Sequence, residues 1–507
     1  MPLPTGDMAW PPPHIGPALD AMHTWDTWWS GDPDRLESLY GGSTGGGLDP
    51  KRLAATMSGG IRGRIARWWW GTPTAAGERR TKLHVPIAGD LCGGSADLLF
   101  SEPPRFTVDD DTTQDRLDVL TDDGMLATLQ TAAEIGAALG GIYLRPVYDQ
   151  DVADRAWITA EHADRALPEF AWGRLSAVTF WRVVREEDGQ VWRWLQRHEP
   201  SRILHGLYQG TKDKLGRPVP LEDSEETAGF ATVVNDEGAV ETGYAGLDVV
   251  YIPNQSSRRW RCHPRLKDWG RSDLDGVEPL MDALDETYSS WMRDIRLGKG
   301  RIVVPETYLE SNGPGRGASW NPDQEAFAGI SMLDRGTNGG MQLTVTQFAI
   351  RVQEHQDTAE DLVNQILRSA GYSGQTFGIG GDVAVTATEV TARERRSMTT
   401  RGKKVLRWRP ALAQLVEALL AVDQYAFGGG AVPQRPTVEF QDSVQEDPLS
   451  LANTADVLRR AQAASTDTLV RMAHPEWDDD QVAAEVDRIR QEQGMAVPDP
   501  MQTGALP

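Results

Sequence analysis

Residues 273–297 read DLDGVEPLMDALDETYSSWMRDIRL, a long run with an amphipathic period. Apolar side chains recur along it at alternating steps of four and three, at Val277, Met281, Leu284, Tyr288, Trp291 and Ile295. Such spacing places them on one seam of a straight helix, which suits packing against other helices. Ser272-Asp273-Leu274-Asp275 resembles a capping box, so we expect the helix to begin there.

Residues 348–370 repeat this rhythm and predict a second helix of nearly equal length. Its seam carries Phe348, Val352, His355, Ala359, Leu362 and Ile366. At 1.5 Å per residue the two helices would each span roughly 35–38 Å, so they could stand antiparallel as a matched pair. Gly371 is expected to end the second helix.

A third helix is predicted over residues 386–427. Thr386 and Glu389 form a capping-box pattern at its start, and Pro410 inside it should kink or split it. Between the second and third helices, residues 372–385 contain four glycines and predict a loop.

The start of the third helix is strongly basic, although the chain as a whole is acidic. Its cations are Arg393, Arg395, Arg396, Arg401, Lys403, Lys404, Arg407 and Arg409, and only Glu389 and Glu394 oppose them. Three interpretations stay open: a solvated helix face, contact with phosphates, or pairing with acidic residues of a neighbouring subunit. The acidic residues considered for that pairing are Asp275, Glu278, Asp282 and Asp285.

The first 260 residues predict a mixed α+β domain. Helices are expected at 86–99 and 115–139, and short strands at 177–184, 190–196 and 248–253, separated by turns such as Asp188-Gly189. After the helical block, residues 436–440 predict a returning strand, and 450–493 predict two or three short helices.

Composition narrows the class of protein. The net charge of −23 argues against a tight nucleic-acid binder, because such binding places Lys and Arg against phosphates. The negative charge does not exclude a protein that surrounds DNA without binding it tightly. Two cysteines are too few for a disulfide framework. No basic residue precedes Arg35, and the apolar stretches are short, so we expect a soluble protein without a cleavable signal.

Strings that resemble catalytic motifs lack the context their chemistry needs. Residues 41–45 match G-x-S-x-G, but within a glycine run that no strand precedes. The glycines at 298–300 and 378–381 lack phosphate-loop spacing, and the nine histidines are scattered. We therefore expect no catalytic residue, no cofactor and no metal site, so the chain is not expected to be an enzyme.

The order of these parts resembles portal proteins of long-tailed double-stranded-DNA bacteriophages. The resemblance is carried by residues 82–88, 95–100, 197–200 with Ile203 and His205, 249–254, 273–297, and Thr388-Glu389-Val390 with Arg393-Glu394. The basic residues are mostly arginine, which suggests a GC-rich genome, and we expect a phage of an actinobacterium.

The resemblance implies a mainly helical α+β subunit with wing, stem, clip and crown, assembled as a ring that is usually dodecameric. The implied parts are 1–265 for the N-terminal part of the wing, 266–297 for the first stem helix, 298–347 for the clip, 348–371 for the second stem helix, 372–386 for the channel (tunnel) loop, 387–445 for the long kinked helix and return to the wing, 446–493 for the crown helices, and 494–507 for a disordered tail.

The implied function is a channel at one capsid vertex for packaging and ejecting DNA. The implied partners are further copies of the chain, the major capsid protein, the terminase motor, a head–tail connector and a scaffolding protein, with double-stranded DNA passing through and no membrane. The loop residues expected to line the channel are Gln375, Thr376, Phe377, Ile379, Asp382 and Val383. The alternatives are another minor capsid or head–tail adaptor protein, and a DNA-processing enzyme.

Overall fold

The computed structural model describes residues 3–4, 6–42, 82–297, 301–303, 310–311, 318–319, 344–346, 350–378, 387–440, 448–474, 477 and 479–492. The chain forms two compact units. The first comprises Met1–Phe100, Phe106–Gly381 and Arg393–Val438, and the second comprises Ser101–Arg105, Asp382–Ala392 and Glu439–Pro507. Helices and sheets are both present, which confirms the α+β class.

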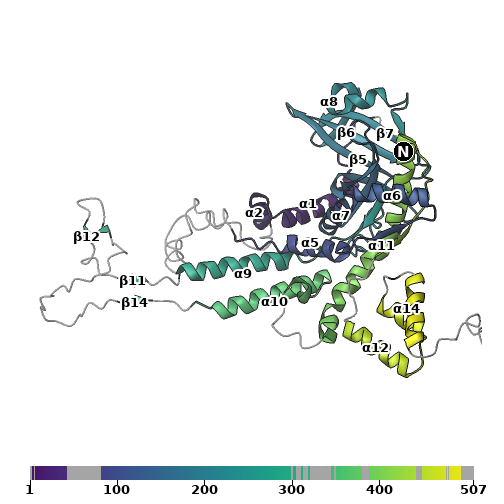
Figure 1. The fold of residues 1–507 in the computed structure, drawn as a ribbon. Coiled ribbons are helices and arrows are strands. Elements are labelled where there is room, and N and C mark those ends of the chain that lie inside the picture. The colour runs from purple at the N-terminus through teal and green to yellow at the C-terminus, as the bar shows by residue number, and fades with distance from the viewer. Residues whose placement is uncertain are drawn as a thin grey trace, which may run out of the picture. The chain divides into compact units, whose positions relative to one another are not determined.

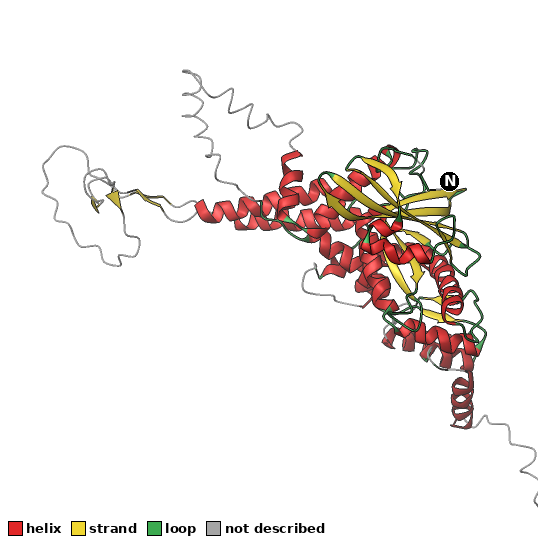
Figure 2. Cartoon of the chain, turned by 90° about the horizontal axis from the view of Figure 1, so that it is seen from above, coloured by secondary structure: helices red, strands yellow, loops and turns green. Residues whose placement is uncertain are grey.

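Two antiparallel sheets gather at one end of the first unit, and helices α9 and α10 extend from it (Figures 1 and 2). The larger sheet has the order β4 (Ala166–Ala171), β5 (Arg174–Glu187), β6 (Gln190–Glu199), β7 (Arg202–Thr211), β8 (Lys214–Val219), with β9 (Ala239–Glu241) also on β7. The smaller sheet has the order β10 (Val250–Pro253), β2 (Gly141–Val147), β3 (Trp157–His162). The strands expected at 177–184, 190–196 and 248–253 are confirmed. Asp188 and Gly189 both have positive φ, as a tight hairpin turn requires.

The helices of the first unit that precede α9 among the described residues are α1 (Gly16–Ser30), α2 (Pro33–Gly42), α5 (Ile87–Phe100), α6 (Asp111–Asp122), α7 (Met125–Leu139) and the short α8 (Glu225–Ala228). Helix α5 confirms the expectation at 86–99, and α7 packs on β2 and β3. The prediction of a single helix over residues 115–139 is wrong. Gly124, at φ 78°, breaks it into α6 and α7, and Asp110 caps α6 by accepting from the Thr113 N–H.

Helices α9 (Glu278–Leu297) and α10 (Val352–Ala370) pack side by side and confirm the predicted pair. Asp294, near the end of α9, accepts from Arg351 and lies 3.0 Å from His355 Nε2, both at the start of α10, so the helices run antiparallel. They contain 20 and 19 residues. Each is therefore about 30 Å long, shorter than expected. The predicted capping box is wrong, because Ser272 and Asp273 precede α9 by several residues.

Helix α11 (Ala387–Phe427) is the longest element, with 41 residues. Pro410 lies inside it without splitting it. Beyond Pro410 the helix is buried through Leu412, Leu415, Val416 and Leu419, and this packing offsets the lost backbone hydrogen bond.

Short elements complete the first unit and its boundary. β1 (Arg105–Thr107) pairs with β15 (Thr437–Glu439), which confirms the returning strand expected at 436–440. β11 (Arg301–Val303) pairs with β14 (Thr344–Thr346), and β12 (Glu310–Ser311) pairs with β13 (Ala318–Ser319). The 3₁₀ turns are η1 (Pro13–Ile15), η2 (Ala163–Arg165), η3 (Leu221–Asp223), η4 (Gly229–Thr232) and η6 (Gly374–Phe377).

The second unit contains the helices α12 (Pro448–Arg460), α13 (Thr466–Ala473) and α14 (Asp479–Glu492), as predicted for 450–493. Val470, Val482 and Val486 form its core, with Trp477 and Ile489 packed against them. The tail 494–507 lies outside the described residues. Across the parts of the chain that the structure describes, every helix falls short of the length and apolar content that a membrane span requires.

Candidate functional site at the junction of three helices

A buried ion pair joins α11 to the segment that leads into α9. Lys404 Nζ lies 2.7 Å from Asp273 Oδ2, and the two residues are 3% and 1% exposed. The Tyr372 hydroxyl, just after α10, lies 2.8 Å from the same carboxylate oxygen and 2.9 Å from Ser95 Oγ on α5. We call Ser95, Asn254, Gln255, Asp273, Tyr372 and Lys404 the junction cluster.

Asp273 is the centre of the junction cluster. Its second oxygen, Oδ1, accepts from Asn254 at 2.8 Å and from Gln255 at 2.7 Å, both following β10. Burial opposes ionisation of this carboxyl, but the charge of Lys404 and the hydrogen bonds from Lys404, Asn254 and Tyr372 outweigh it and lower its pKa. Burial and the Asp273 charge raise the pKa of Tyr372, which keeps its hydroxyl as a donor. The cluster thus links the smaller sheet, α5, α10 and α11 through one charge.

The turn after α10 is fixed to α11 and α5. Gly371 ends α10 at φ 106°, and its carbonyl accepts from Thr400 Oγ1 at 2.6 Å. The Ser373 N–H donates to Ser397 Oγ on α11 at 3.0 Å, and Thr376 Oγ1 lies 2.8 Å from the same atom. Three contacts therefore hold this turn against one face of α11.

Phe377 fixes the same turn to α5. A Cβ on Gly94 of α5 would lie 2.5 Å from Phe377 Cε1, so any larger residue there would force the ring to move. The ring also packs edge-on against Tyr372, with centroids 5.9 Å apart. Gln375, Thr376 and Phe377, all expected to line a channel, are partly buried in η6. Ile379, Asp382 and Val383 lie outside the described residues.

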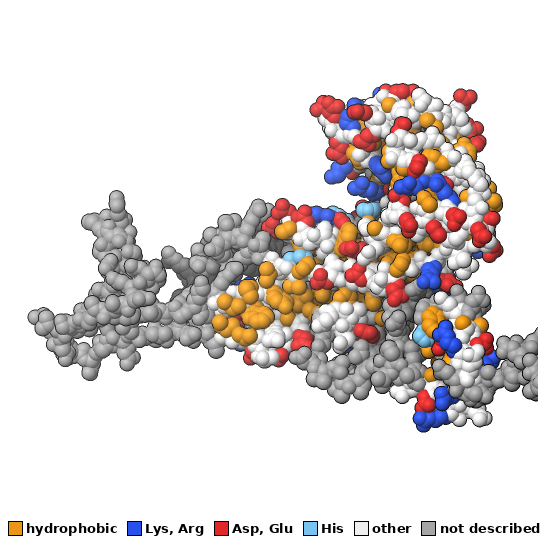
Figure 3. Space-filling view, in the orientation of Figure 1, with side chains coloured by type: hydrophobic (Ala, Val, Ile, Leu, Met, Phe, Trp, Pro, Cys, Tyr) orange, Lys and Arg blue, Asp and Glu red, His pale blue; other side chains and the backbone are white. Residues whose placement is uncertain are grey.

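The predicted seam of the helix pair has two parts. Val277, Met281, Leu284 and Ile366 are buried within the subunit. Toward the other end, Tyr288, Trp291 and Leu362 are partly buried, while Ile295 and Val352 are exposed by 39% and 47%. His355 stacks on Trp291 with 6° between the ring planes. Figure 3 shows hydrophobic side chains gathered over this end of α9 and α10.

The acidic residues in and just before α9 form hydrogen bonds and ion pairs with other residues of the same chain. Lys82 lies 2.7 Å from Asp282, and Asp285 accepts from the Val85 N–H at 2.8 Å and lies 3.0 Å from His84 Nδ1. Glu278 accepts from Trp25 Nε1, and Asp275 lies 3.5 Å from Arg259. These four carboxylates, considered as partners for a neighbouring subunit's basic helix, instead hold α9 to its own chain.

The basic residues of α11 divide between two faces. Lys404 belongs to the junction cluster, and Arg401 is buried and donates to the Leu98 carbonyl, so neither forms part of an outward basic face as expected. Arg407 is partly buried and donates to Ser256 Oγ. The exposed cations are Arg395, Arg396, Lys403 and Arg409. The side chain of Arg393 lies outside the described set.

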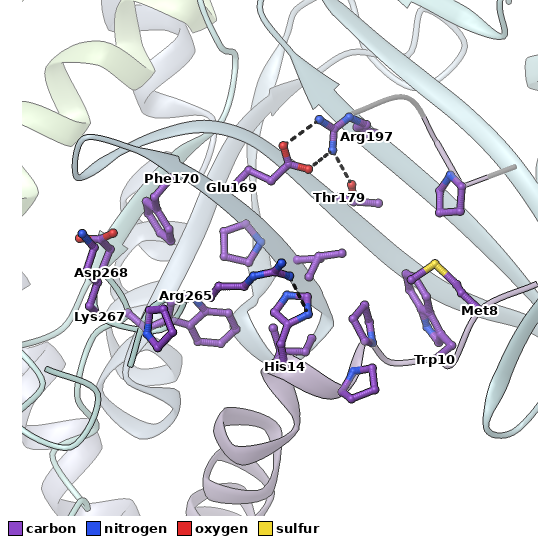
Figure 4. A pocket seen from close by; sticks show the side chains of 18 of the residues that line it. Met8, Trp10, His14, Glu169, Phe170, Thr179, Arg197, Arg265, Lys267 and Asp268 are labelled. Atoms are coloured by element: carbon purple, nitrogen blue, oxygen red, sulfur yellow. Dashed lines mark hydrogen bonds and ion pairs between the residues drawn. The ribbon is translucent and has the colours of Figure 1, made fainter. Parts of the chain in front are cut away.

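A pocket of about 700 Å³ opens beside the larger sheet (Figure 4). Arg197 and Glu169 lie in its wall, joined at 2.6 Å, and Arg265 lies 3.2 Å from His14 Nδ1. Burial and the Arg265 charge lower the pKa of His14. Arg265, Lys267 and Asp268 also line the pocket, and much of its remaining surface carries Trp, Phe and Pro side chains. This arrangement favours packing over catalysis.

The interactions described above hold elements of the fold together. Among them, no group of three or more His, Cys, Asp or Glu could hold a metal ion. The junction cluster presents a saturated carboxylate and a lysine that is already paired. What the cluster can do is fix the relative positions of α5, α10 and α11.

The chain combines an α+β body with an antiparallel helix pair, and a buried cluster joins that pair to a long helix. This arrangement is typical of a structural protein. A family model described as "Phage portal protein, SPP1 Gp6-like" matches residues 230–499. The chain belongs to this phage portal family, whose members are structural components of the virion and are not enzymes.

The other comparisons found more distant likenesses. The neck of an empty GTA particle, computed with C6 symmetry, has 13% identity and a TM-score of 0.40, covering 84% of this chain and 95% of that chain. The neck of a native GTA particle, computed with C12 symmetry, has 14% identity and a TM-score of 0.39, covering 84% and 99%. No curated protein matches the chain.

Proposed function

We propose that the chain is the subunit of a closed portal ring through which double-stranded DNA is packaged and ejected. The observation that carries this proposal is the antiparallel α9–α10 pair, fixed to α11 by the junction cluster, in a chain of the phage portal family. A ring that resists the force of DNA movement needs its helices held at fixed angles, and a buried, fully paired carboxylate supplies such a constraint.

The proposed parts follow the resemblance, with boundaries refined by the elements. Helices α9 and α10 form the stem, with 298–347 between them as the clip. Residues 1–265 and α11 with its return to 445 form the wing, and α12 to α14 form the crown. We assign the channel loop to the residues after Gly378, because η6 is fixed to α5 and α11.

The proposed partners are other copies of the chain, twelve in the family's usual ring, and the proteins of a capsid vertex. Terminase and head–tail connector proteins would dock at the clip, and the major capsid protein would surround the ring, with a scaffolding protein as a further partner during assembly. DNA would pass with few phosphate contacts, in keeping with the net charge of −23. We also propose an actinobacterial host.

The purified chain should assemble into rings. Light scattering across protein concentrations and salt should give the mass of a closed oligomer, and electron microscopy should show particles with a central channel. Closed symmetry is expected because a heterologous interface that repeats at a fixed rotation ends in a ring. A monomeric mass at every concentration would refute the proposed function. Rings without a stem would favour a head–tail adaptor.

A further inference from the structure

Helix α10 carries an exposed acidic face. Glu354, Asp357 and Asp361 follow one line of the helix at steps of three and four, with Glu360 beside them, and all four are exposed. Among the described residues none of them makes an ion pair. This distinguishes the α10 acids from those of α9, which bind Lys82, His84, Trp25 and Arg259.

Helix α11 carries the complementary face. Arg396 and Lys403 lie on one line of the helix, with Arg395 and Arg409 to one side of it, and all four are exposed. The described part of the chain offers none of them an ion-pair partner. Leu406, in the same face, is 73% exposed.

The two faces have similar lengths and opposite charges. Glu354 to Asp361 spans seven residues and Arg395 to Lys403 spans eight, which correspond to about 10 and 12 Å of helix. The basic face also has an exposed aliphatic neighbour, Leu406 on α11. Protein interfaces combine such apolar contacts with complementary charge.

We infer that the acidic face of α10 in one subunit binds the basic face of α11 in the next copy of this chain. This inference rests on the proposed ring, and it names the contact that orders the subunits. The two faces lie on different helices, as a heterologous ring interface requires. A second copy fits better than DNA, because an exposed leucine lies within the basic face and because the acidic face of α10 is complementary to it in charge.

The test is charge reversal with complementation. The acidic-face variant carries Glu354→Lys, Asp357→Lys and Asp361→Lys, and the basic-face variant carries Arg395→Glu, Arg396→Glu and Lys403→Glu. Each alone places like charges in every interface, so the assembled fraction at about 0.15 M salt should fall at least tenfold. An equimolar mixture should form rings in which the two variants alternate, because each interface is then again of opposite sign. A chain with both sets should also assemble.

Controls separate this inference from the proposed ring. Glu222→Lys, Glu225→Lys and Glu226→Lys reverse three exposed acids elsewhere and should leave assembly unchanged. Circular dichroism should show that every variant remains folded. Normal rings from both single-face variants, or no rescue in the mixture, would overturn the inference while the wild-type ring still stands. Normal rings that retain less DNA after loss of the basic face would assign that face to nucleic acid. A monomeric wild type would instead refute the ring itself.

Discussion

Replacing Lys404 with alanine should lower the free energy of unfolding of the first unit by about 3–5 kcal/mol, as expected when a buried ion pair loses one partner. Asp273 would remain 1% exposed with only Tyr372, Asn254 and Gln255 as donors. Three neutral donors do not replace a cation at 2.7 Å in an interior of low dielectric constant. Urea denaturation followed by tryptophan fluorescence measures the change.

Lys403 provides the matched control for this prediction. It is the adjacent residue on the same helix and carries the same charge, but it is exposed. Lys403→Ala should change the free energy of unfolding by no more than about 0.5 kcal/mol. If both alanine variants unfold at the same denaturant concentration, the junction cluster does not stabilise the fold as we argue. Asp273→Asn combined with Lys404→Met should recover part of the loss, because no unpaired charge is then buried.

The same pair predicts a pH dependence. The folded pKa of Asp273 lies below its ordinary value of 3.8, so its stabilising contribution is complete above that pH and is lost as the pH falls through the folded value. Without Lys404, burial favours the protonated acid. The difference between wild type and Lys404→Ala should therefore shrink as the pH falls, beginning above pH 3.8, because the buried acid of the variant takes up a proton before the unfolded chain does. A difference that grows on acidification would contradict the assigned charges.

The helix pair could be predicted because the spacing of apolar residues that defines each helix lies within a short stretch of sequence. Val277, Met281 and Leu284 lie on the buried seam as the spacing indicated. The start of α9 could not be predicted in the same way. Asp273 resembles a capping residue, but its partner Lys404 lies 131 positions further along the chain. A single sequence gives no sign of that pairing, so the cluster was missed.

The basic residues of α11 lie on two different faces of the helix, although the sequence analysis treats them as one group. Ser397, Lys404 and Trp408 share the buried side with Val405 and Leu412, at helical spacing. The apolar residues on that side are Val405, Trp408 and Leu412, and their spacing is the signal in the sequence that Arg401 and Lys404 point inward. The partners they find there were not visible.

Introducing aspartate at both Ile295 and Val352 should abolish ring assembly while the subunit remains folded. These side chains are 39% and 47% exposed, so neither is needed for the core. They flank the partly buried Trp291, whose Nε1 lacks a hydrogen-bond partner among the described residues. An apolar end of a helix pair is stabilised by burial against a neighbour, and aspartate there would have to be desolvated without a cation. The assembled fraction should fall at least tenfold by light scattering.

Val119 on α6 gives the comparison that decides this prediction, because it is 46% exposed, almost the same as Val352. Val119→Asp introduces one such charge at a valine of nearly equal exposure outside the α9–α10 pair. It should leave the rings intact, and all variants should unfold at nearly the wild-type denaturant concentration. Rings from the stem variant equal in amount to the wild type would mean that this apolar end faces something other than a neighbouring subunit. Loss of rings in both variants would mean that added negative charge, rather than lost apolar contact, prevents assembly.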